Sequence, residues 1–461
     1  MSKLNTKYIL AISLVSALGG LLFGYDWVVI GGAKPFYEKF FDITNSPGLQ
    51  GWAMSSALLG CLIGAITSGI FSDRHGRKRL LIFAAFLFSL SAVGTGASNN
   101  YTPFILYRIM GGIGIGLASN LSPMYIAEIS PASVRGKFVS LNQLTIVIGI
   151  LLAQLANWQI AEPVAPDATD AEILASWNGQ MAWRWMFWAE TIPAGLFFIL
   201  MFFVPESPRW LAKNGKEEKV ESILARIGGK EYAYREYHNI RKTLSAETGK
   251  VNYRDLLQPG LRKVLLIGIV IAAFQQWCGI NVIFNYAEEV FEAAGYGVSD
   301  ILFNIVVTGS VNLIFTFIAI YTVDKLGRRA LMLLGSGGLA GIYAVMGAAY
   351  YFQITGWPLL LLVVMGIACY AMSLAPVTWV VLSEIFPNRI RGAAMAVATV
   401  SLWLASFLLT FTFPLLNNAF GASGTFWVYG IICIAGLIFI YKKLPETKGK
   451  TLEEIEIEIV K

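Results

Sequence analysis

The sequence has few charges, few histidines and few cysteines for its length. Of its 461 residues 14% are charged and 56% are hydrophobic, and the mean hydropathy is +0.61. A soluble globular domain carries roughly 25% charged residues. A chain this long with so few charges cannot cover a surface exposed to water, so we expect a lipid bilayer to be its solvent.

Most enzyme chemistry also lacks its usual residues. The two histidines, His75 and His238, lie in charged segments, and each of the four cysteines stands alone in an apolar run. None of the cysteines has the C-x-x-C spacing of a zinc or redox site. There is no obvious nucleophile–base pair or phosphate-binding loop. We therefore expect no enzyme activity, no metal and no cofactor.

Twelve apolar segments are long enough to cross a bilayer as helices, which takes about 20 residues each. They are residues 8–30, 50–72, 80–98, 103–126, 138–158 and 184–204, then 264–286, 301–323, 330–351, 357–382, 393–415 and 423–441. Between the two groups of six, residues 205–263 contain 21 charged residues among 59. We expect an all-α membrane protein with an N-terminal six-helix bundle in 1–204, a cytoplasmic helical linker in 205–263, a C-terminal bundle in 264–441 and a cytoplasmic tail in 442–461.

The net charge of +6 and the pI near 9.0 have a simple explanation in this arrangement. Four basic residues gather in 73–79, three in 324–329 and thirteen in the linker, whereas the loops on the opposite side are uncharged or acidic. Basic residues accumulate in cytoplasmic loops and set orientation. We expect both termini to be cytoplasmic, and we expect no nucleic acid as a partner because no basic stripe faces a soluble domain.

The two halves repeat three motifs in the same order. Asp73-Arg-His-Gly-Arg-Lys78 recurs as Asp324-Lys-Leu-Gly-Arg-Arg329, and Glu128-Ile-Ser-Pro recurs as Glu384-Ile-Phe-Pro. Pro205-Glu-Ser-Pro-Arg209 is echoed by Pro445-Glu-Thr-Lys-Gly449. Parallel repeats of six helices are the plan of major facilitator transporters, which bind substrate between the halves near the bilayer midplane.

Read together, these motifs resemble the sugar porter family of the major facilitator superfamily over nearly the whole chain. The resemblance extends to Gly19–Asp26, Gln275–Asn281 and Pro376–Trp379, and it is strongest to bacterial D-xylose–proton symporters and their hexose relatives. It implies secondary active import of a monosaccharide, a pentose or hexose, by proton symport. We further expect a multi-pass protein of the cell membrane, in bacteria the inner membrane, that works as a monomer in the lipid bilayer.

Asp26 is the only acidic residue in the first predicted span, and a carboxylate there costs about 2.5–3.5 kcal/mol on insertion scales. Its natural partner is Arg108, the isolated charge of the fourth span. Burial raises the pKa of a carboxyl group and a neighbouring cation lowers it, so this pair has the means to exchange a proton. The alternative is a permanent structural ion pair. The resemblance favours proton coupling, because proton-coupled sugar porters tend to have Asp here.

A sugar site needs amide side chains for the hydroxyl edges and an aromatic ring for an apolar face. Gln275, Gln276 and Asn281 supply amides on the seventh span, and a local unwinding near Gly279 would let them converge. The resemblance adds Gln143, Asn312, Trp379 and Trp403. The alternative for each amide is a hydrogen bond between helices. Ile150, Asn285 and Leu402 depart from the xylose transporter pattern, which has glutamine, tyrosine and glutamine, so the preferred sugar stays open.

A second set of charged residues is expected at the cytoplasmic ends of the spans. The resemblance implies that they form gating ion pairs that bridge the halves and the linker in the outward-facing state, and the alternative is that they set topology only. They are Asp73, Arg77, Glu128, Arg135 and Glu190 in the first half and Asp324, Arg328, Glu384 and Arg391 in the second.

Two further alternatives concern the chain as a whole. Gly111–Gly116 has glycines spaced as in a dinucleotide-binding loop, but it lacks the preceding strand of that motif, so we expect close helix packing instead. A passive sugar facilitator would also fit the family, although Asp26 argues against it. A transport-deficient sugar sensor would need a long signalling tail, whereas about twenty residues follow the last span.

Overall fold

The computed structural model describes residues 4–131, 133–165, 168–246, 258–386 and 391–448. These residues form helices and, within the described ranges, no strand. Eleven helical segments are long and apolar enough to span a membrane. The last of them, Gly392–Lys443, has 52 residues and changes direction at Gly421, where φ is 65°, so it contains two spans. The prediction of an all-α protein with about twelve spans is confirmed.

The first half of the chain supplies six spans. α1 (Thr6–Phe40) and α2 (Pro47–His75) are followed by α3 (Arg77–Ala97), α4 (Tyr101–Ile129) and α5 (Arg135–Ile160). A short α6 (Asp170–Ala175) precedes the sixth span, which consists of the π-helix η1 (Asn178–Ala182), α7 (Trp183–Ala189) and α8 (Thr191–Phe203). The sixth span thus begins six residues before the segment 184–204 that the sequence predicts.

Two amphipathic helices, α9 (Pro208–Lys213) and α10 (Glu217–Ala246), follow within the predicted linker. The second half then contains α11 (Pro259–Trp277), α12 (Ile280–Asn285), α13 (Ala287–Glu292), α14 (Val298–Leu326), α15 (Arg328–Tyr351), α16 (Trp357–Met372), α17 (Leu374–Ile385) and α18 (Arg391–Lys443). α11 already begins at Pro259, inside the range predicted as linker. The first turn of α11 still has the polar composition of the linker.

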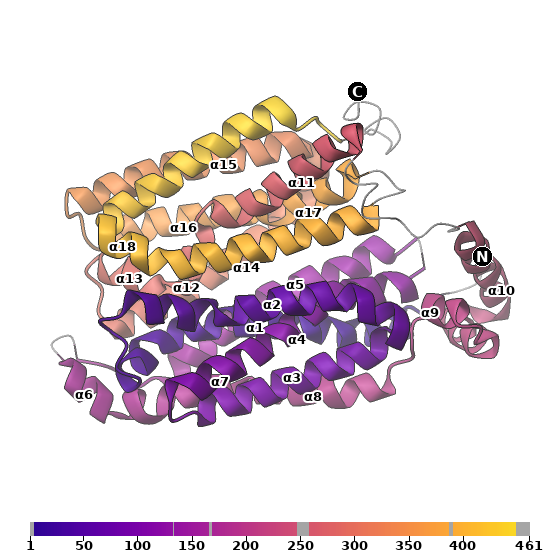
Figure 1. Ribbon diagram of the computed structural model, residues 1–461, viewed down its shortest axis with the longest axis horizontal. Helices are drawn as coiled ribbons and strands as arrows, with labels where there is room; N and C mark the ends of the chain where they lie inside the picture. Colours follow the sequence, from indigo (N-terminus) through magenta and orange to yellow (C-terminus); the bar gives the residue numbers. More distant parts are fainter. Residues whose placement is uncertain (1–3, 132, 166–167, 247–257, 387–390, 449–461) are drawn as a thin grey trace.

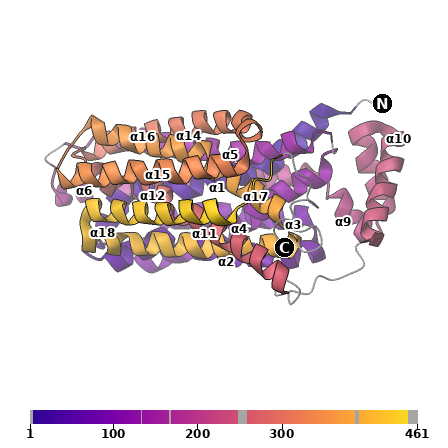
Figure 2. The ribbon, with the colours of Figure 1, turned by 90° about the horizontal axis from the view of Figure 1, so that it is seen from above.

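The two halves lie side by side with their helices roughly parallel to one long axis (Figure 1). Helices α9 and α10 project beyond one end, which we call the linker end, and the same end carries the start of α1 (Figures 1 and 2). The short helices α6 and α13 lie at the opposite, distal end. Contacts between the halves run mainly along α2 against α18 and α5 against α14.

Glycines allow the helices of the first half to pack closely. A Cβ atom on Gly112 of α4 would lie 1.9 Å from the carbonyl oxygen of Ala57 in α2, and one on Gly116 would lie 2.2 Å from that of Cys61. No side chain fits at these distances. Small residues at such positions let membrane helices approach each other. The expectation that Gly111–Gly116 is a packing motif is confirmed.

Candidate functional site

Asp26 and Arg108 form an ion pair in the middle of the first half. Each is about 1% exposed, and an Arg108 Nη1–H donates a hydrogen bond to Asp26 Oδ1. The second guanidinium nitrogen lies 3.4 Å from the Asp26 backbone oxygen. The ring of Phe187 covers Arg108 at 5.7 Å. Because the bilayer core cannot solvate either charge, α1 and α4 are held together at this point.

The other carboxylate oxygen of this pair has no hydrogen-bond partner among the described residues. Asp26 Oδ2 is buried and unpaired, and so is Asn285 Oδ1 at the end of α12. Both side chains line one small cavity together with Arg108 and Trp27. Asn285 belongs to the second half, so the cavity lies between the halves. The structure therefore brings a residue predicted only as a specificity position next to the predicted proton site.

Glu190 is not at the cytoplasmic end of a span, and that prediction is wrong. The residue lies between α7 and α8, in the middle of the span Asn178–Phe203, and is 2% exposed. It is close enough to Asp26 and Arg108 to interact electrostatically with both. The sixth span runs from the distal end to the linker end, and Glu190 lies 13 residues before its last residue, Phe203, so the residue is inside the bundle.

Three predicted amides form a continuous hydrogen-bonded chain in the second half. Asn281 Nδ2 donates to Gln276 Oε1 at 2.5 Å, and Gln276 Nε2 donates to Gln275 Oε1 at 2.6 Å. Gln275 Nε2 then donates to the hydroxyl of Tyr370 at 2.8 Å. All three amide residues are buried. Gly279, with φ of 85°, interrupts the span between α11 and α12, so the expected unwinding is confirmed.

The remaining predicted substrate residues lie on several helices around this chain. Asn312 of α14 is 6% exposed, while Gln143 of α5 and Trp379 of α17 are half-buried. Trp403 of α18 packs against Phe23 and Trp27 of α1, with ring centroids 5.7 and 6.0 Å apart. Trp403 thus joins the two halves near Asp26. Ile150 is half-buried on α5, and Leu402 is buried on α18.

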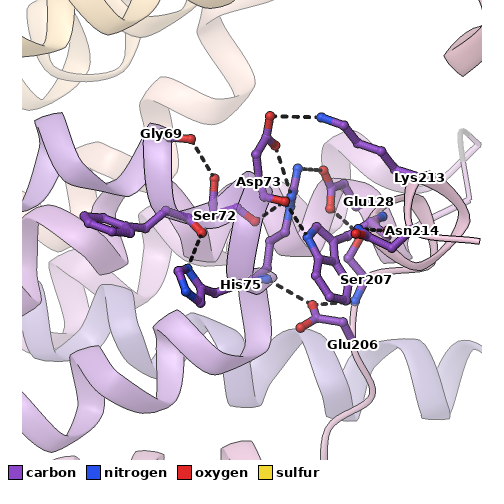
Figure 3. Close-up of polar contacts among 12 residues, drawn as sticks. Gly69, Ser72, Asp73, His75, Glu128, Glu206, Ser207, Lys213 and Asn214 are labelled. Carbon is purple, nitrogen blue, oxygen red and sulfur yellow. Dashed lines mark hydrogen bonds and ion pairs between the residues drawn. The ribbon is translucent and has the colours of Figure 1, made fainter. Parts of the chain in front are cut away.

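At the linker end, ion pairs attach the first half to the linker (Figure 3). Arg77 lies 2.9 Å from Glu128 and 3.5 Å from Asp73, and Asp73 lies 2.9 Å from Lys213 of α9. Ser207 donates a hydrogen bond to Glu128. This group contains three of the predicted gating residues, Asp73, Arg77 and Glu128, and its ion pairs among the described residues stay within the first half and the linker. Arg135 is exposed at the start of α5.

The second half repeats this group. Arg328 lies 3.1 Å from Glu384, and the hydroxyl of Thr447 donates to Glu384 at 2.6 Å. Glu446 accepts hydrogen bonds from the backbone N–H groups of Arg328 and Lys448, each at 3.0 Å. Burial by itself would raise the pKa of Glu446, but these N–H donors outweigh it and lower the pKa. The side chains of Asp324 and Arg391 lie outside the described residues.

Sequence reasoning missed two features of this site. Tyr370, which ends the amide chain, is one of many aromatic residues in apolar spans, and no signal in the sequence sets it apart. Lys34, near the distal end of α1, falls just beyond the predicted span 8–30, yet it is 2% exposed. Three carboxylates surround it. The available signal for this cluster in the sequence was a lone lysine, Lys34, four residues before Glu38.

Comparisons with known proteins identify this arrangement. The family model described as "Sugar (and other) transporter" matches residues 12–459. The chain belongs to the sugar transporter family. This sugar transporter is thus a multi-pass membrane protein and not an enzyme, as the sequence predicts.

Its relatives cover it almost completely. The sugar transporter is 43% identical to the D-xylose-proton symporter of Escherichia coli strain K12, over 98% of this chain and 96% of that protein. It is 38% identical to the arabinose-proton symporter of Bacillus subtilis strain 168, over 97% and 94%. The solved inward open conformation of the E. coli xylose transporter XylE matches with a TM-score of 0.85 and 40% identity, covering 98% and 100%. The predicted major facilitator fold is confirmed.

Proposed function

We propose that this protein imports a pentose or hexose together with a proton, and that Asp26 carries the proton. Membership of the sugar transporter family and the names of its xylose and arabinose relatives support symport of a sugar with a proton. The observation that carries the assignment of Asp26 is local. Its carboxylate is buried and bound through one oxygen to Arg108, its other oxygen has no partner among the described residues, and its side chain lines a small cavity between the halves.

This geometry gives the proton a reason to bind and a reason to leave. A carboxylate in a dry bundle is stabilised by a paired cation or by protonation, and the two compete. When the halves move, the distance from Asp26 to Arg108 and the access of water to the cavity both change. Asn285 of the second half lines the same cavity and its Oδ1 has no partner among the described residues, so we assign it as the acceptor for a protonated Asp26. Protonation is thereby linked to the approach of the two halves.

The amide chain provides the sugar site. Amides that hydrogen-bond to one another in the absence of sugar can exchange those bonds for sugar hydroxyls at little cost in unpaired polar groups. Gln275, Gln276 and Asn281 make such a chain, and Trp403 offers an aromatic face at the boundary of the halves. Gln143, Asn312 and Trp379 complete the site. Ile150 and Leu402 make one rim apolar, so the preferred sugar is to be determined by experiment.

The linker end faces the cytoplasm in this proposal. Basic residues dominate 73–79, 324–329 and the linker, which favours that orientation under the positive-inside rule. The N-terminal bundle, the linker and the C-terminal bundle then form one monomeric transporter in the bacterial inner membrane. The ion pairs at the linker end act as gating contacts that re-form across the halves when the cytoplasmic side closes.

Sugar-induced pH change in lightly buffered cells tests this function. Cells that express the protein are expected to raise the external pH when a transported sugar is added, and a panel of pentoses, hexoses and inositol identifies that sugar. A passive facilitator would take up the same sugar without a pH change. A sensor would bind it without uptake. Either of these two results would reject symport.

A further inference from the structure

Lys34 is a buried cation at the distal end of α1. Its side chain is 3% exposed, and its ammonium lies 3.1 Å from Glu38, 3.0 Å from Glu288 and 2.9 Å from Glu289. The carboxylate of Glu38 also accepts a hydrogen bond from Gln50 at 2.9 Å. One lysine thus contacts three carboxylates, and its own ammonium is buried beneath them.

These contacts connect the two halves of the protein. Glu38 is one turn along α1 from Lys34, but Glu288 and Glu289 belong to α13, more than 250 residues away in the second half. Removing one side of a buried ion pair is strongly unfavourable, because the other charge is left without a partner. Separating α1 from α13 therefore requires that water replace both glutamates around Lys34.

Other contacts between the halves lie near the same end. The backbone N–H of Val164 donates to the hydroxyl of Ser299 at 2.9 Å. The ring of Trp52, near the start of α2, lies 6.2 Å from that of Phe407 in α18. At the linker end, by contrast, the described ion pairs of Arg77 and of Arg328 stay within their own halves. Of the described ion pairs, those that join the two halves lie at the distal end.

We infer that Lys34, Glu288 and Glu289 form an ionic latch that closes the distal side of the transport pathway, and that the latch opens once in each transport cycle. The Asp26 cavity is lined from both halves, and the latch joins α1 to the second half eight residues further toward the distal end of α1. The inference rests on the proposed function only in that the two halves alternate access. It assigns Lys34, Glu288 and Glu289 as positioning residues that set the balance between the two states.

The charge of the latch makes it sensitive to pH. One lysine and three glutamates leave a formal excess of two negative charges. Burial, and then the neighbouring Glu288, raise the pKa of Glu289 to about 6, although Lys34 acts in the opposite direction. The titratable and charged groups around Glu289 come from several elements. Lys34, Tyr37 and Glu38 lie on α1, and Tyr286 and Glu288 lie beside Glu289. Glu292 and the Lys39–Asp170 ion pair lie at the edge of this group.

The pKa of Glu289 differs between the closed and the open latch. Glu289 in an open, hydrated latch returns to the usual, lower pKa of a glutamate. The closed latch therefore binds a proton more tightly than the open latch does. Lowering the pH through about 6 stabilises the closed state, and raising it above 7 favours opening. A proton from the distal side thus promotes closure of that side.

The test measures the distance across the distal end by double electron–electron resonance. Spin labels are placed at the exposed positions Asn45, in the first half, and Asn418, near the turn of α18. Partly buried Cys369 is replaced by alanine, and the other three cysteines are buried. The full chain is measured in nanodiscs of neutral lipid without sugar and without a proton gradient.

The variant is the double substitution Glu288→Gln and Glu289→Gln, which breaks the contact between halves and leaves Lys34 paired with Glu38. Its matched control is Asp300→Asn, an exposed carboxylate in the first turn of α14. We expect the ratio of the long-distance to the short-distance population to rise about tenfold in the double variant, which is ~1.4 kcal/mol. The control is expected to stay at the wild-type ratio.

Acid provides the second readout. In the wild type the short-distance population is expected to grow several-fold as the pH falls from about 8 to about 5.5, and in the double variant it is not. An unchanged distance ratio in the folded double variant, or the same pH response in both proteins, overturns the latch. The single variants Glu288→Gln and Glu289→Gln replace the double one if it does not fold. Because no sugar or gradient is present, failure of the Asp26 proposal leaves this result unaffected.

Discussion

Arg328 pairs with Glu384 at 3.1 Å at the linker end of the second half, and the pair reproduces the 2.9 Å contact between Arg77 and Glu128 in the first half. The repeat extends to the residues around each pair. The hydroxyl groups of Ser207 and Thr447 donate hydrogen bonds to Glu128 and Glu384, respectively. Ser207 and Thr447 stand at equivalent places in the two repeated Pro-Glu motifs. The same local structure is therefore built twice, from motifs that the sequence repeats.

Glu446 is expected to stabilise this local structure in a pH-dependent way. Its carboxylate accepts backbone hydrogen bonds from Arg328, Arg329 and Lys448, which lower its pKa. A group whose pKa is lowered by folding stabilises the protein above its unfolded pKa and loses that effect as the pH falls. Glu446→Gln should lower the Tm of the purified protein by ~2–4 °C at neutral pH.

The difference between Glu446→Gln and wild type should shrink as the pH falls below about 4.3, the ordinary pKa of a glutamate, and through the lower pKa of the folded carboxylate. Thermal unfolding followed by fluorescence across this pH range measures it. The exposed Glu221→Gln on α10 serves as the matched control. A deficit that stays constant with pH would show that the carboxylate charge is not the cause.

Gln276 is the central member of the amide chain, since it donates to Gln275 and accepts from Asn281. Gln276→Leu removes both bonds and leaves buried polar partners unsatisfied, which costs about 1–3 kcal/mol. The Kd for the transported sugar should rise about tenfold or more. Quenching of tryptophan fluorescence measures it, because Trp379 and Trp403 belong to the proposed sugar site. Exposed Asn418→Leu should bind sugar as wild type does, and equal affinity in both variants would remove Gln276 from the site.

Gly112 should tolerate no side chain. Gly112→Ala places a methyl group against the carbonyl oxygen of Ala57 and forces α2 and α4 apart, at a cost of about 1–3 kcal/mol. Gly341 of α15 is a matched control, because a Cβ there meets open space. Thermal unfolding should show a Tm several degrees lower for Gly112→Ala, with Gly341→Ala unchanged or slightly higher, since alanine favours helix. Equal Tm values would contradict the packing assignment.

The sequence predicted this fold well because the bilayer imposes simple requirements on it. Apolar runs of about 20 residues had to become spans, and a lone buried aspartate needed a cation, which Arg108 supplies. The unwinding at Gly279 followed from the spacing of Gln276 and Asn281, which does not suit one face of a regular helix. These features depend on local sequence and on one dominant physical cost.

Features that depend on a partner far away in the chain were not predictable. α1 continues ten residues beyond the predicted span, and Glu288 and Glu289, which neutralise Lys34 there, lie in the second half, so the first half shows only the spacing of Lys34 and Glu38. The depth of Glu190 was wrong because the residue lies 13 residues before Phe203, where the sixth span reaches the linker end. Arg184 also depends on distant partners, because its guanidinium donates hydrogen bonds to the carbonyl oxygens of Gly96 and Ser98.

The most direct test of the central claim, that Asp26 carries the proton, compares two modes of transport in Asp26→Asn. Proteoliposomes containing the identified sugar are measured for accumulation driven by a proton gradient and for exchange of internal for external sugar. Asp42→Asn, an exposed change at the distal end of α1, is the control and should behave as wild type. We expect Asp26→Asn to abolish accumulation and to retain exchange. Accumulation driven by the proton gradient in Asp26→Asn would contradict the account.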